Sequence, residues 1–196
     1  MYLQFGKRIF DFTVALVGLI VLLLPMGVIA LLIWGTSGRP ILFIQDRVGK
    51  DGKVFRVKKF RTMNVRKTDI NTVTIAGDQR ITPIGKYLRR WKLDELPQLW
   101  NVLVGEMSFV GPRPDVPGYA DKLEGDNRRL LHLRPGITGP ATLAYRNEEE
   151  MLAKVDDPIR YNDEVIYPDK VRRNLEYIEH CSLWKDLSYI WQTIAH

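Results

Sequence analysis

The feature that most constrains this chain is a long uncharged run near its N-terminus. No charged residue occurs from Phe12 to Gly38, and the centre of the run reads FTVALVGLIVLLLPMGVIALLIW. About 20 apolar residues are enough to cross the hydrocarbon of a bilayer. A cleaved signal peptide would have a shorter apolar core, of about 7 to 15 residues, followed by a small-residue cleavage site. The run here ends in WGTSGRP, so we expect a retained membrane segment.

Two observations favour a segment that enters and leaves the membrane on the same side. Pro25 lies near the centre of the run, with Gly18 and Gly27 close by, and a proline inside a helix removes a hydrogen bond and kinks it. Both flanks of the run are basic, and the positive-inside rule would keep both in the cytoplasm. We therefore expect a re-entrant helix that breaks at Pro25. A kinked helix that spans the bilayer is the alternative, since such helices tolerate proline.

Composition narrows the range of partners. The chain has 196 residues, which suits one domain, and its formal net charge of +6 suits an anionic partner. Cys181 is the only cysteine, so no disulfide can form within the chain, and three scattered histidines argue against a zinc site. Nucleic acid is a weak candidate because the basic residues are spread out and no binding motif is present.

The rest of the chain predicts an α+β fold. Two β-prone runs within residues 41–63 flank the turn Gly49-Lys50-Asp51-Gly52 and predict a β-hairpin. Thr82-Pro83 is typical of a helix start, and the basic and apolar helix after it could lie on a membrane surface. A loop is expected over 64–80 and a short polar helix around 119–131. Apolar spacing from 170 to 193 predicts one or two amphipathic helices.

An acidic pair stands out where the common nucleotide-binding and hydrolase motifs are missing. Asp94 and Glu95 lie in LDELPQLWNV, just before Pro97, which is expected to begin a new helix. Adjacent carboxylates can hold Mg²⁺ together with substrate phosphates, and a carboxylate can attack phosphorus to form an acyl phosphate. The helix N-terminus would keep Asp94 ionised. The alternative is structural: Asp94 caps the helix, and Glu95 lies in solvent.

Two arginines lie in loops that contain several prolines and glycines. Arg113 lies in SFVGPRPDVPG and Arg134 in LRPGITGP. A guanidinium on a stiff loop is a good phosphate ligand because its fork can bind two oxygens at once. Either arginine could instead be structural and bond loop carbonyls. Four of the five tryptophans are expected in the core or at a membrane interface rather than around a ligand; they are Trp91, Trp100, Trp184 and Trp191.

Four strings occur in an order that carries a resemblance to a known family. They are KRIFDFTVAL, FIQDRVGKDGKVFRVKKFRTM, LDELPQLWNVLVGEMSFVGPRP and RPGITG. Together they closely resemble the bacterial sugar transferases, the monotopic phosphoglycosyl transferases that start glycan assembly on polyprenol phosphate. The similarity runs from about Lys7 to the C-terminal amphipathic helices. The length matches the minimal catalytic form of the family, without the additional transmembrane helices of larger members.

The resemblance implies roles for individual residues. Residues 1–39 would form the re-entrant helix with its break at Pro25, and residues 40–196 a compact catalytic domain on the cytoplasmic membrane surface. Asp94 would be the nucleophile, and the Asp94-Glu95 pair would bind Mg²⁺. Pro112 and Pro114 would frame the substrate loop. The phosphate ligands would be Lys59, Arg61, Thr62, Arg89, Arg113, Arg134 and Arg146.

The chain departs from the family pattern in two places. Many members have Ser before the helix-breaking proline, whereas Leu24 precedes Pro25 here, so a serine bond to the helix backbone is missing. Many members continue RPGITG with Trp-Ala-Gln, whereas this chain has Pro140-Ala141-Thr142 followed by LAYRNEEE. The second departure could reshape the sugar or nucleotide pocket, and it weakens the analogy for Arg146.

The expected function is transfer of a phosphosugar from a UDP-sugar to undecaprenyl phosphate, with release of UMP and a covalent intermediate on Asp94. The expected partners are the UDP-sugar, the polyprenol phosphate and the bilayer, with a homodimer left open and no nucleic acid. The expected location is the cytoplasmic face of a bacterial inner membrane. Two alternatives stay open: a membrane glycosyltransferase that releases UDP, and a non-catalytic basic adaptor at the membrane surface.

Overall fold

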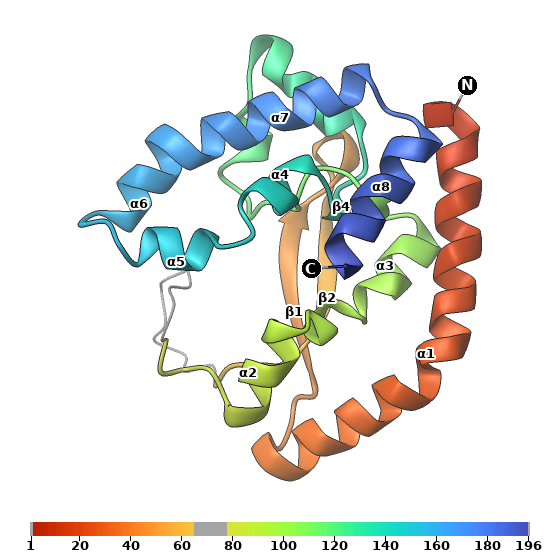
Figure 1. Ribbon diagram of the computed structural model, residues 1–196, viewed down its shortest axis with the longest axis vertical. Coiled ribbons are helices and arrows are strands. Elements are labelled where there is room, and N and C mark those ends of the chain that lie inside the picture. The colour runs from red at the N-terminus through yellow and green to blue at the C-terminus, as the bar shows by residue number, and fades with distance from the viewer. Residues whose placement is uncertain (1, 65–77, 196) are drawn as a thin grey trace.

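The structure is a computed structural model that describes residues 2–64 and 78–195, and Figure 1 traces its path. The predicted α+β class is confirmed. The loop expected over 64–80 lies almost wholly outside the described residues. In chain order the helices and strands are α1 (Lys7–Ser37), β1 (Leu42–Val48), β2 (Val54–Phe60), α2 (Pro83–Arg90), α3 (Gln98–Val104), β3 (Ser108–Val110), β4 (Gly136–Thr138), α4 (Pro140–Ala144), α5 (Glu148–Leu152), α6 (Pro158–Tyr161), α7 (Tyr167–Glu179) and α8 (Leu183–Ile194).

Local sequence signals placed several of these elements correctly. β1 and β2 form the predicted antiparallel hairpin, from Leu42 opposite Phe60 to Val48 opposite Val54. Thr82 caps α2 by accepting a hydrogen bond from the Gly85 backbone N–H at 3.0 Å. The two C-terminal amphipathic helices are α7 and α8. The helix expected around 119–131 is instead two 3₁₀ segments, at Ala120–Lys122 and Gly125–His132.

The free edge of β2 is covered by a side chain from α3. Asn101 is fully buried, and its amide accepts a hydrogen bond from the Lys58 N–H at 3.1 Å. The same amide donates to the Arg56 carbonyl at 2.8 Å. A strand in a two-stranded sheet has unpaired backbone groups along its outer edge, and burying such groups is costly. Asn101 satisfies two of them and thereby fixes α3, with the acidic pair just before it, against β2.

The N-terminal helix α1 is continuous rather than broken. It runs unbroken from Lys7 to Ser37 with Pro25 inside it, and Figure 1 shows that it changes direction part-way along its length. The expected interruption at Pro25 is therefore not found. Proline removes one hydrogen bond, to the carbonyl four residues earlier, and a bent helix can accommodate that loss.

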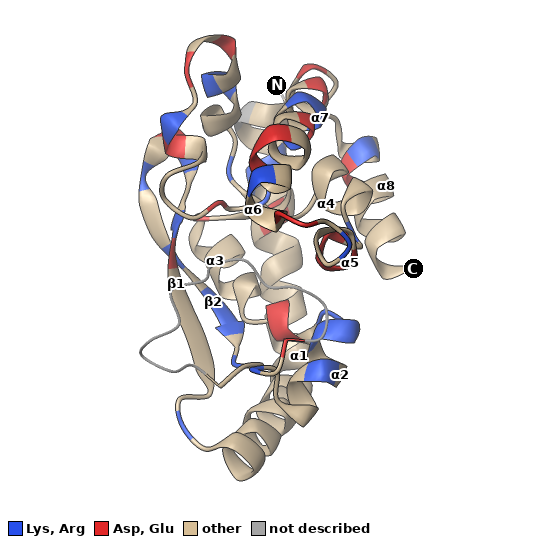
Figure 2. Ribbon diagram, turned by 90° about the vertical axis from the view of Figure 1, so that its left-hand side faces the viewer, with Lys and Arg blue, Asp and Glu red and all other residues tan. Residues whose placement is uncertain are grey.

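The surface of α1 is largely apolar. It is the one helix in the described part of the chain that is long and apolar enough to cross a membrane. Leu23 and Leu24, beside Pro25, are 73% and 79% exposed. In Figure 2 the ribbon of its C-terminal half, at the bottom, carries no charged residue, whereas acidic and basic residues mark the elements above it. Exposed apolar surface of this extent marks a membrane or partner contact.

A buried polar cluster ties the first turn of α1 to the C-terminal helices. Lys7 forms an ion pair with Asp186 of α8 and donates to the Tyr177 hydroxyl of α7 at 3.1 Å. Tyr2 and Tyr177 both donate to the Asp186 carboxylate. Lys7 is 6% exposed and Asp186 fully buried, so each charge depends on the other. The N- and C-terminal segments are therefore joined by a desolvated ion pair.

We expect Asp186→Ala to lower the free energy of unfolding by about 3–5 kcal/mol, because the buried Lys7 ammonium would lose its counter-ion. The thermal midpoint of the detergent-solubilised protein measures the loss. A matched control is the exposed pair of Arg160 and Glu164, four residues apart. Glu164→Ala should cost no more than about 0.5 kcal/mol. Equal midpoints for the two variants would contradict the prediction.

Candidate active site

The acidic pair lies on a tight turn between α2 and α3. Residues Leu93–Glu95 form a 3₁₀ turn, and Lys92 before it adopts a left-handed conformation with φ 52°. Pro97 immediately precedes α3, as the sequence predicted, but no side chain caps that helix. Asp94 therefore does not act as an N-cap, and Glu95 is not free in solvent. Both carboxylates are half-buried and face a group of cations.

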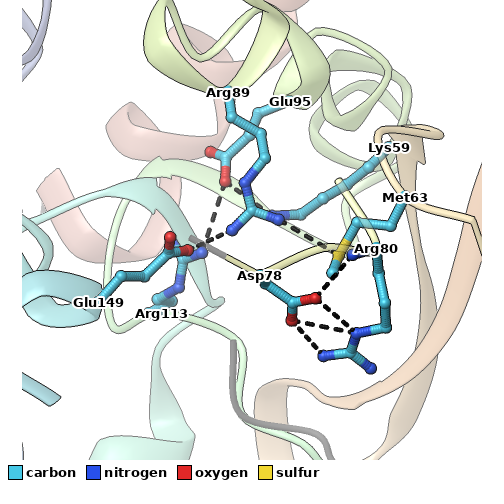
Figure 3. Close-up of polar contacts among 8 residues, drawn as sticks. All are labelled: Lys59, Met63, Asp78, Arg80, Arg89, Glu95, Arg113 and Glu149. Carbon is cyan, nitrogen blue, oxygen red and sulfur yellow. Dashed lines mark hydrogen bonds and ion pairs between the residues drawn. The ribbon is translucent and has the colours of Figure 1, made fainter. Parts of the chain in front are cut away.

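Glu95 is held by two cations from distant parts of the chain. Its Oε1 lies 2.7 Å from Nζ of Lys59, on β2, and 3.5 Å from a terminal nitrogen of Arg113 (Figure 3). Burial acts to raise the pKa of Glu95, but the charges of Lys59 and Arg113 outweigh it and hold this pKa at about 2. Glu95 is therefore a permanent anion. Burial also lowers the pKa of Lys59, an effect that the Glu95 carboxylate opposes.

Asp94 has the opposite electrostatic setting. Burial and the neighbouring Glu95 charge raise the pKa of Asp94 to about 6, against the opposing charges of Lys59 and Arg89. The sequence predicted that a helix N-terminus would keep Asp94 ionised. α3 begins only at Gln98, the helix-dipole effect is confined to the first turn, and with a pKa of about 6 Asp94 is mainly ionised above pH 6. Within the described chain, the Asp94 carboxylate has no ion pair or side-chain hydrogen bond. It is a half-buried carboxylate that no described side chain fixes in place.

The Pro-Arg-Pro loop presents Arg113 from a braced backbone. Pro112 and Pro114 are buried, whereas the Arg113 side chain is 43% exposed. The Pro112 carbonyl accepts from Gly136 N–H at 2.7 Å, and the Pro114 carbonyl accepts from Arg47 at 3.0 Å. The loop is thus fixed at both prolines, which directs the arginine between them toward Glu95.

Glycines explain why the two motif loops fit together. A Cβ added at Gly111 would lie 2.4 Å from the Arg134 carbonyl oxygen, and one at Gly136 would lie 2.2 Å from the Gly111 nitrogen. The GPRP and RPGITG segments therefore pack backbone against backbone, at a spacing that only glycine permits. The RPGITG segment thereby supports the GPRP loop that carries Arg113.

Arg89 reaches the site from α2. Its charge helps to hold down the pKa of Asp94. One terminal nitrogen of Arg89 forms an ion pair with Glu149 of α5, and the other lies 3.4 Å from Sδ of Met63 (Figure 3). Lys92 also faces this region: burial lowers its pKa, while the Glu95 carboxylate opposes that effect. The cations near the pair are thus Lys59, Arg89, Lys92 and Arg113.

Two other predicted phosphate ligands, Arg61 and Arg134, have backbone contacts elsewhere. Arg61 donates to the carbonyl oxygens of Ser37, Gly38 and Arg39, at 2.5, 2.9 and 3.0 Å, and so holds the C-terminal end of α1. Arg134 donates to the Gly105 carbonyl at 2.8 Å, at the opposite end of α3 from the acidic pair. A helix of this length spans about 10 Å.

Arg146 and Thr62 lie in different settings again. Arg146 is exposed and donates to the Gln192 carbonyl at 3.1 Å, although its charge still acts on Lys92. Thr62 is buried, and its carbonyl accepts from the Thr82 N–H at 2.9 Å. Its side chain has no hydrogen bond with another described residue. To bind phosphate, the three arginines would have to give up or add to their present hydrogen bonds, and Thr62 would have to become accessible.

Sequence reasoning missed three residues around the site. Lys92 lies two positions before Asp94, and that closeness in sequence was the available signal. Arg47 braces the Pro-Arg-Pro loop from β1, a contact with no local signature because 67 positions separate Arg47 from Pro114. Glu149 belongs to an acidic run, and its ion pair with Arg89 could not be predicted without the fold.

The donor set around the pair fits a magnesium ion. Among the described residues no three His, Cys, Asp or Glu side chains gather as a protein-only metal cage. Mg²⁺ commonly takes only one or two carboxylates and completes its coordination with water and substrate phosphates. Asp94 offers unpaired carboxylate oxygens, and Glu95 uses Oε1 for its ion pairs, which leaves Oε2. These hard oxygen donors are compatible with Mg²⁺.

Comparison with known proteins gives a family assignment. The family model described as bacterial sugar transferase matches residues 2–196. The chain belongs to the bacterial sugar transferase family. The chain is 34% identical to the UDP-galactose-lipid carrier transferase of Erwinia amylovora, over 98% of its own length and 40% of that protein.

Two further relatives have similar identity but different lengths. The UDP-glucose:undecaprenyl-phosphate glucose-1-phosphate transferase of Klebsiella pneumoniae is 38% identical over 96% of this chain and 39% of its own length. The exopolysaccharide production protein PSS of Rhizobium leguminosarum is 36% identical over 96% of this chain and 93% of its own length. The chain thus spans about two-fifths of the length of the first two relatives and nearly all of the third.

In metal-free protein, Asp94 should titrate near pH 6, and Glu95 should stay ionised down to about pH 2. Asp94 is then neutral below pH 6 and a carboxylate above it. Carbon-13 NMR of labelled carboxyl groups measures both, with Asp94→Asn to assign the signal. Added Mg²⁺ should lower the Asp94 midpoint, because a cation favours the charged form. A metal-free Asp94 midpoint at or below pH 4 would show that burial does not control this group.

Proposed function

We propose that this chain transfers a phosphosugar from a UDP-sugar to undecaprenyl phosphate and releases UMP. The observation that carries the proposal is the asymmetric acidic pair: Glu95 is neutralised by Lys59 and Arg113, whereas the Asp94 carboxylate is half-buried, unpaired and surrounded by cations. The names of the Klebsiella and Erwinia relatives support a UDP-sugar donor and a lipid carrier.

The proposed reaction has two displacements at the same phosphorus. A carboxylate oxygen of Asp94 attacks the β-phosphorus of the UDP-sugar, and the bond to the bridging oxygen breaks, so UMP leaves with that oxygen. The sugar phosphate is then an acyl phosphate on Asp94. A phosphate oxygen of the polyprenol phosphate attacks the same phosphorus, and the bond to Asp94 breaks. This regenerates the carboxylate and yields polyprenol diphosphosugar.

The cations have a common role in this scheme. Charge accumulates on phosphate oxygens in both displacements, and fixed positive groups stabilise that charge. Lys59, Arg89 and Arg113 are the best placed, because each already acts electrostatically on the acidic pair. We retain Arg61, Thr62, Arg134 and Arg146 as proposed ligands only under rearrangement of the contacts they have in this structure.

We propose Mg²⁺ as the cofactor, held by the free oxygens of Asp94 and Glu95. When bound there it would neutralise part of the diphosphate charge. The protein contributes the orientation: Lys59 and Arg113 fix Glu95 through Oε1, and the turn at Lys92 places Asp94 beside it.

We also propose that α1 is re-entrant and that the domain lies on the cytoplasmic face of the bacterial inner membrane. The bend in α1, its exposed apolar surface and its basic flanks support this. The four tryptophans named above support it too, since they are 49–80% exposed, and such side chains anchor proteins at membrane interfaces. An open apolar groove of about 660 Å³ along α1, lined in part by Leu24, Trp34 and Arg39, could accept a lipid chain.

The transferase should show ping-pong kinetics and should release UMP when a panel of UDP-sugars is screened with undecaprenyl phosphate. Asp94→Asn should remove all but about 1% of the activity, since losing a nucleophile typically costs 10²-fold or more. It should also abolish the phosphosugar adduct seen by mass spectrometry. Asp46→Asn, at an exposed position on β1, is the control and should keep full activity.

The same assay separates the alternatives. Release of UDP instead of UMP would indicate a glycosyltransferase, and the absence of any nucleotide release across the panel would favour the adaptor. Chelation with EDTA should stop UMP release, and added Mg²⁺ should restore it. Unchanged activity in EDTA would show that the reaction does not need Mg²⁺. The role of Asp94 as nucleophile would then be tested separately, by the phosphosugar adduct in mass spectrometry.

Re-entry predicts that both ends of α1 lie on one side of the membrane. Cysteines placed at Phe5 and at Ser37, in a Cys181→Ser background, should both react with an impermeant maleimide only after inside-out vesicles or spheroplast lysis expose the cytoplasmic face. A spanning helix would leave one of the two cysteines reactive from the periplasmic face.

A further inference from the structure

Arg89 is engaged by an acidic side chain of the protein itself. Glu149, from the short helix α5, forms an ion pair with one terminal nitrogen of Arg89. Figure 3 shows the Glu149 carboxylate close to Arg89 and on the same side of the site as Arg113. Glu149 is 60 positions from Arg89 in sequence, so this is a tertiary contact that the fold builds.

The neighbouring acid on α5 also faces the cationic side of the site. Oε1 of Glu148 lies 2.7 Å from Nζ of Lys170, and the Glu148 charge also acts on Arg113. Two consecutive carboxylates thus point at the basic groups, whereas the third, Glu150, is exposed and has no ion pair among the described residues. α5 lies in the segment after RPGITG where this chain departs from the family pattern.

The charge balance explains why an internal anion is tolerated there. Lys59, Arg89, Lys92 and Arg113 surround the two carboxylates of the acidic pair, so the site carries excess positive charge before any substrate binds. Like charges gathered in a half-buried site repel one another. The Glu149 carboxylate relieves that repulsion at Arg89, whose charge acts on Asp94.

We propose that Glu149 is an internal stand-in for a substrate phosphate: it occupies Arg89 in the ligand-free protein and is displaced when the diphosphate of the nucleotide sugar binds. This rests on the proposed function. Carboxylate and phosphate oxygens compete for the same guanidinium donors. Among the described residues, the other terminal nitrogen of Arg89 contacts only the Met63 sulfur, a weak acceptor, so a phosphate oxygen would be a stronger acceptor for it. Glu149 therefore sets the affinity for the diphosphate without touching it.

Removing the stand-in should tighten nucleotide binding. UDP is the probe, since it carries the diphosphate without any particular sugar, and its dissociation constant is measured with the full chain in nanodiscs. Glu149→Gln should bind UDP about 2- to 5-fold more tightly, the range expected when a partly exposed ion pair no longer competes. The KM for the UDP-sugar should fall in parallel, with kcat unchanged. Damage to the fold would instead lower kcat.

Two controls isolate the Arg89 contact. Glu150→Gln removes the same charge from the same helix and should leave the UDP dissociation constant unchanged. Arg89→Ala should weaken UDP binding. Adding Glu149→Gln to this variant should give no further change, because Glu149 and the diphosphate no longer have an arginine for which to compete. Glu149→Asp keeps the charge on a shorter side chain, so its UDP dissociation constant should lie between those of wild type and Glu149→Gln. This variant provides a second test if Glu149→Gln folds poorly.

The outcomes separate this inference from the proposed function. UDP binding by Glu149→Gln that is no tighter than by Glu150→Gln, or a gain that persists with Arg89→Ala, would overturn the stand-in role. Weaker binding would overturn it too and would make Glu149 a support for Arg89. If wild type binds UDP and the predicted gain appears but no UMP is ever released, the stand-in role holds and the transferase proposal fails.

Discussion

The ion pair between Lys59 and Glu95 is the interaction on which the site depends. It joins a strand to the turn before α3 across 36 positions of sequence, at 2.7 Å. Because Lys59 and Arg113 neutralise Glu95, that carboxylate stays charged despite burial, and its charge adds to the burial that raises the pKa of Asp94 to about 6. Two neighbouring acids thus acquire different properties from one contact. Without Lys59 the two carboxylates would share a half-buried site with less cation to separate their roles.

The elements that carry the site are also held by hydrogen bonds to backbone groups. Asn101 fixes α3 to β2 through the Lys58 N–H and the Arg56 carbonyl. The Pro-Arg-Pro loop is held at both prolines and packs against Gly136. In each case a buried polar group of the backbone finds its required partner, and a side chain of the proposed active site is positioned as a consequence. Arginines outside the immediate site mostly serve this scaffold, which is why a count of conspicuous arginines overstates the number of phosphate ligands.

Local features were predictable from sequence, whereas tertiary environments were not. The hairpin turn, the Thr82 cap and the start of α3 after Pro97 follow from rules that act over a few residues. The acidic pair could be singled out, but not the difference between its members, because that difference comes from burial and from Lys59 and Arg113. The same holds for Arg61 and Arg134, because an arginine side chain can bind phosphate oxygens or backbone carbonyl oxygens equally well. The continuous helix through Pro25 shows that a proline specifies a bend more surely than a break.

The way α1 is attached links the membrane segment to the chemistry. Its first turn is held by the buried pair of Lys7 and Asp186, and its last carbonyls are held by Arg61. Arg61 follows Lys59 by two residues, about 7 Å of extended chain, so the end of the apolar helix and the cation that controls Glu95 belong to one short segment. If α1 lies in the membrane as proposed, the helix that fixes the depth of the protein in a bilayer would also fix the height of the acidic pair above it. For a reaction between a soluble nucleotide and a lipid-borne phosphate, that height decides whether the second displacement can occur, because the polyprenol phosphate cannot move far from the membrane surface to meet Asp94.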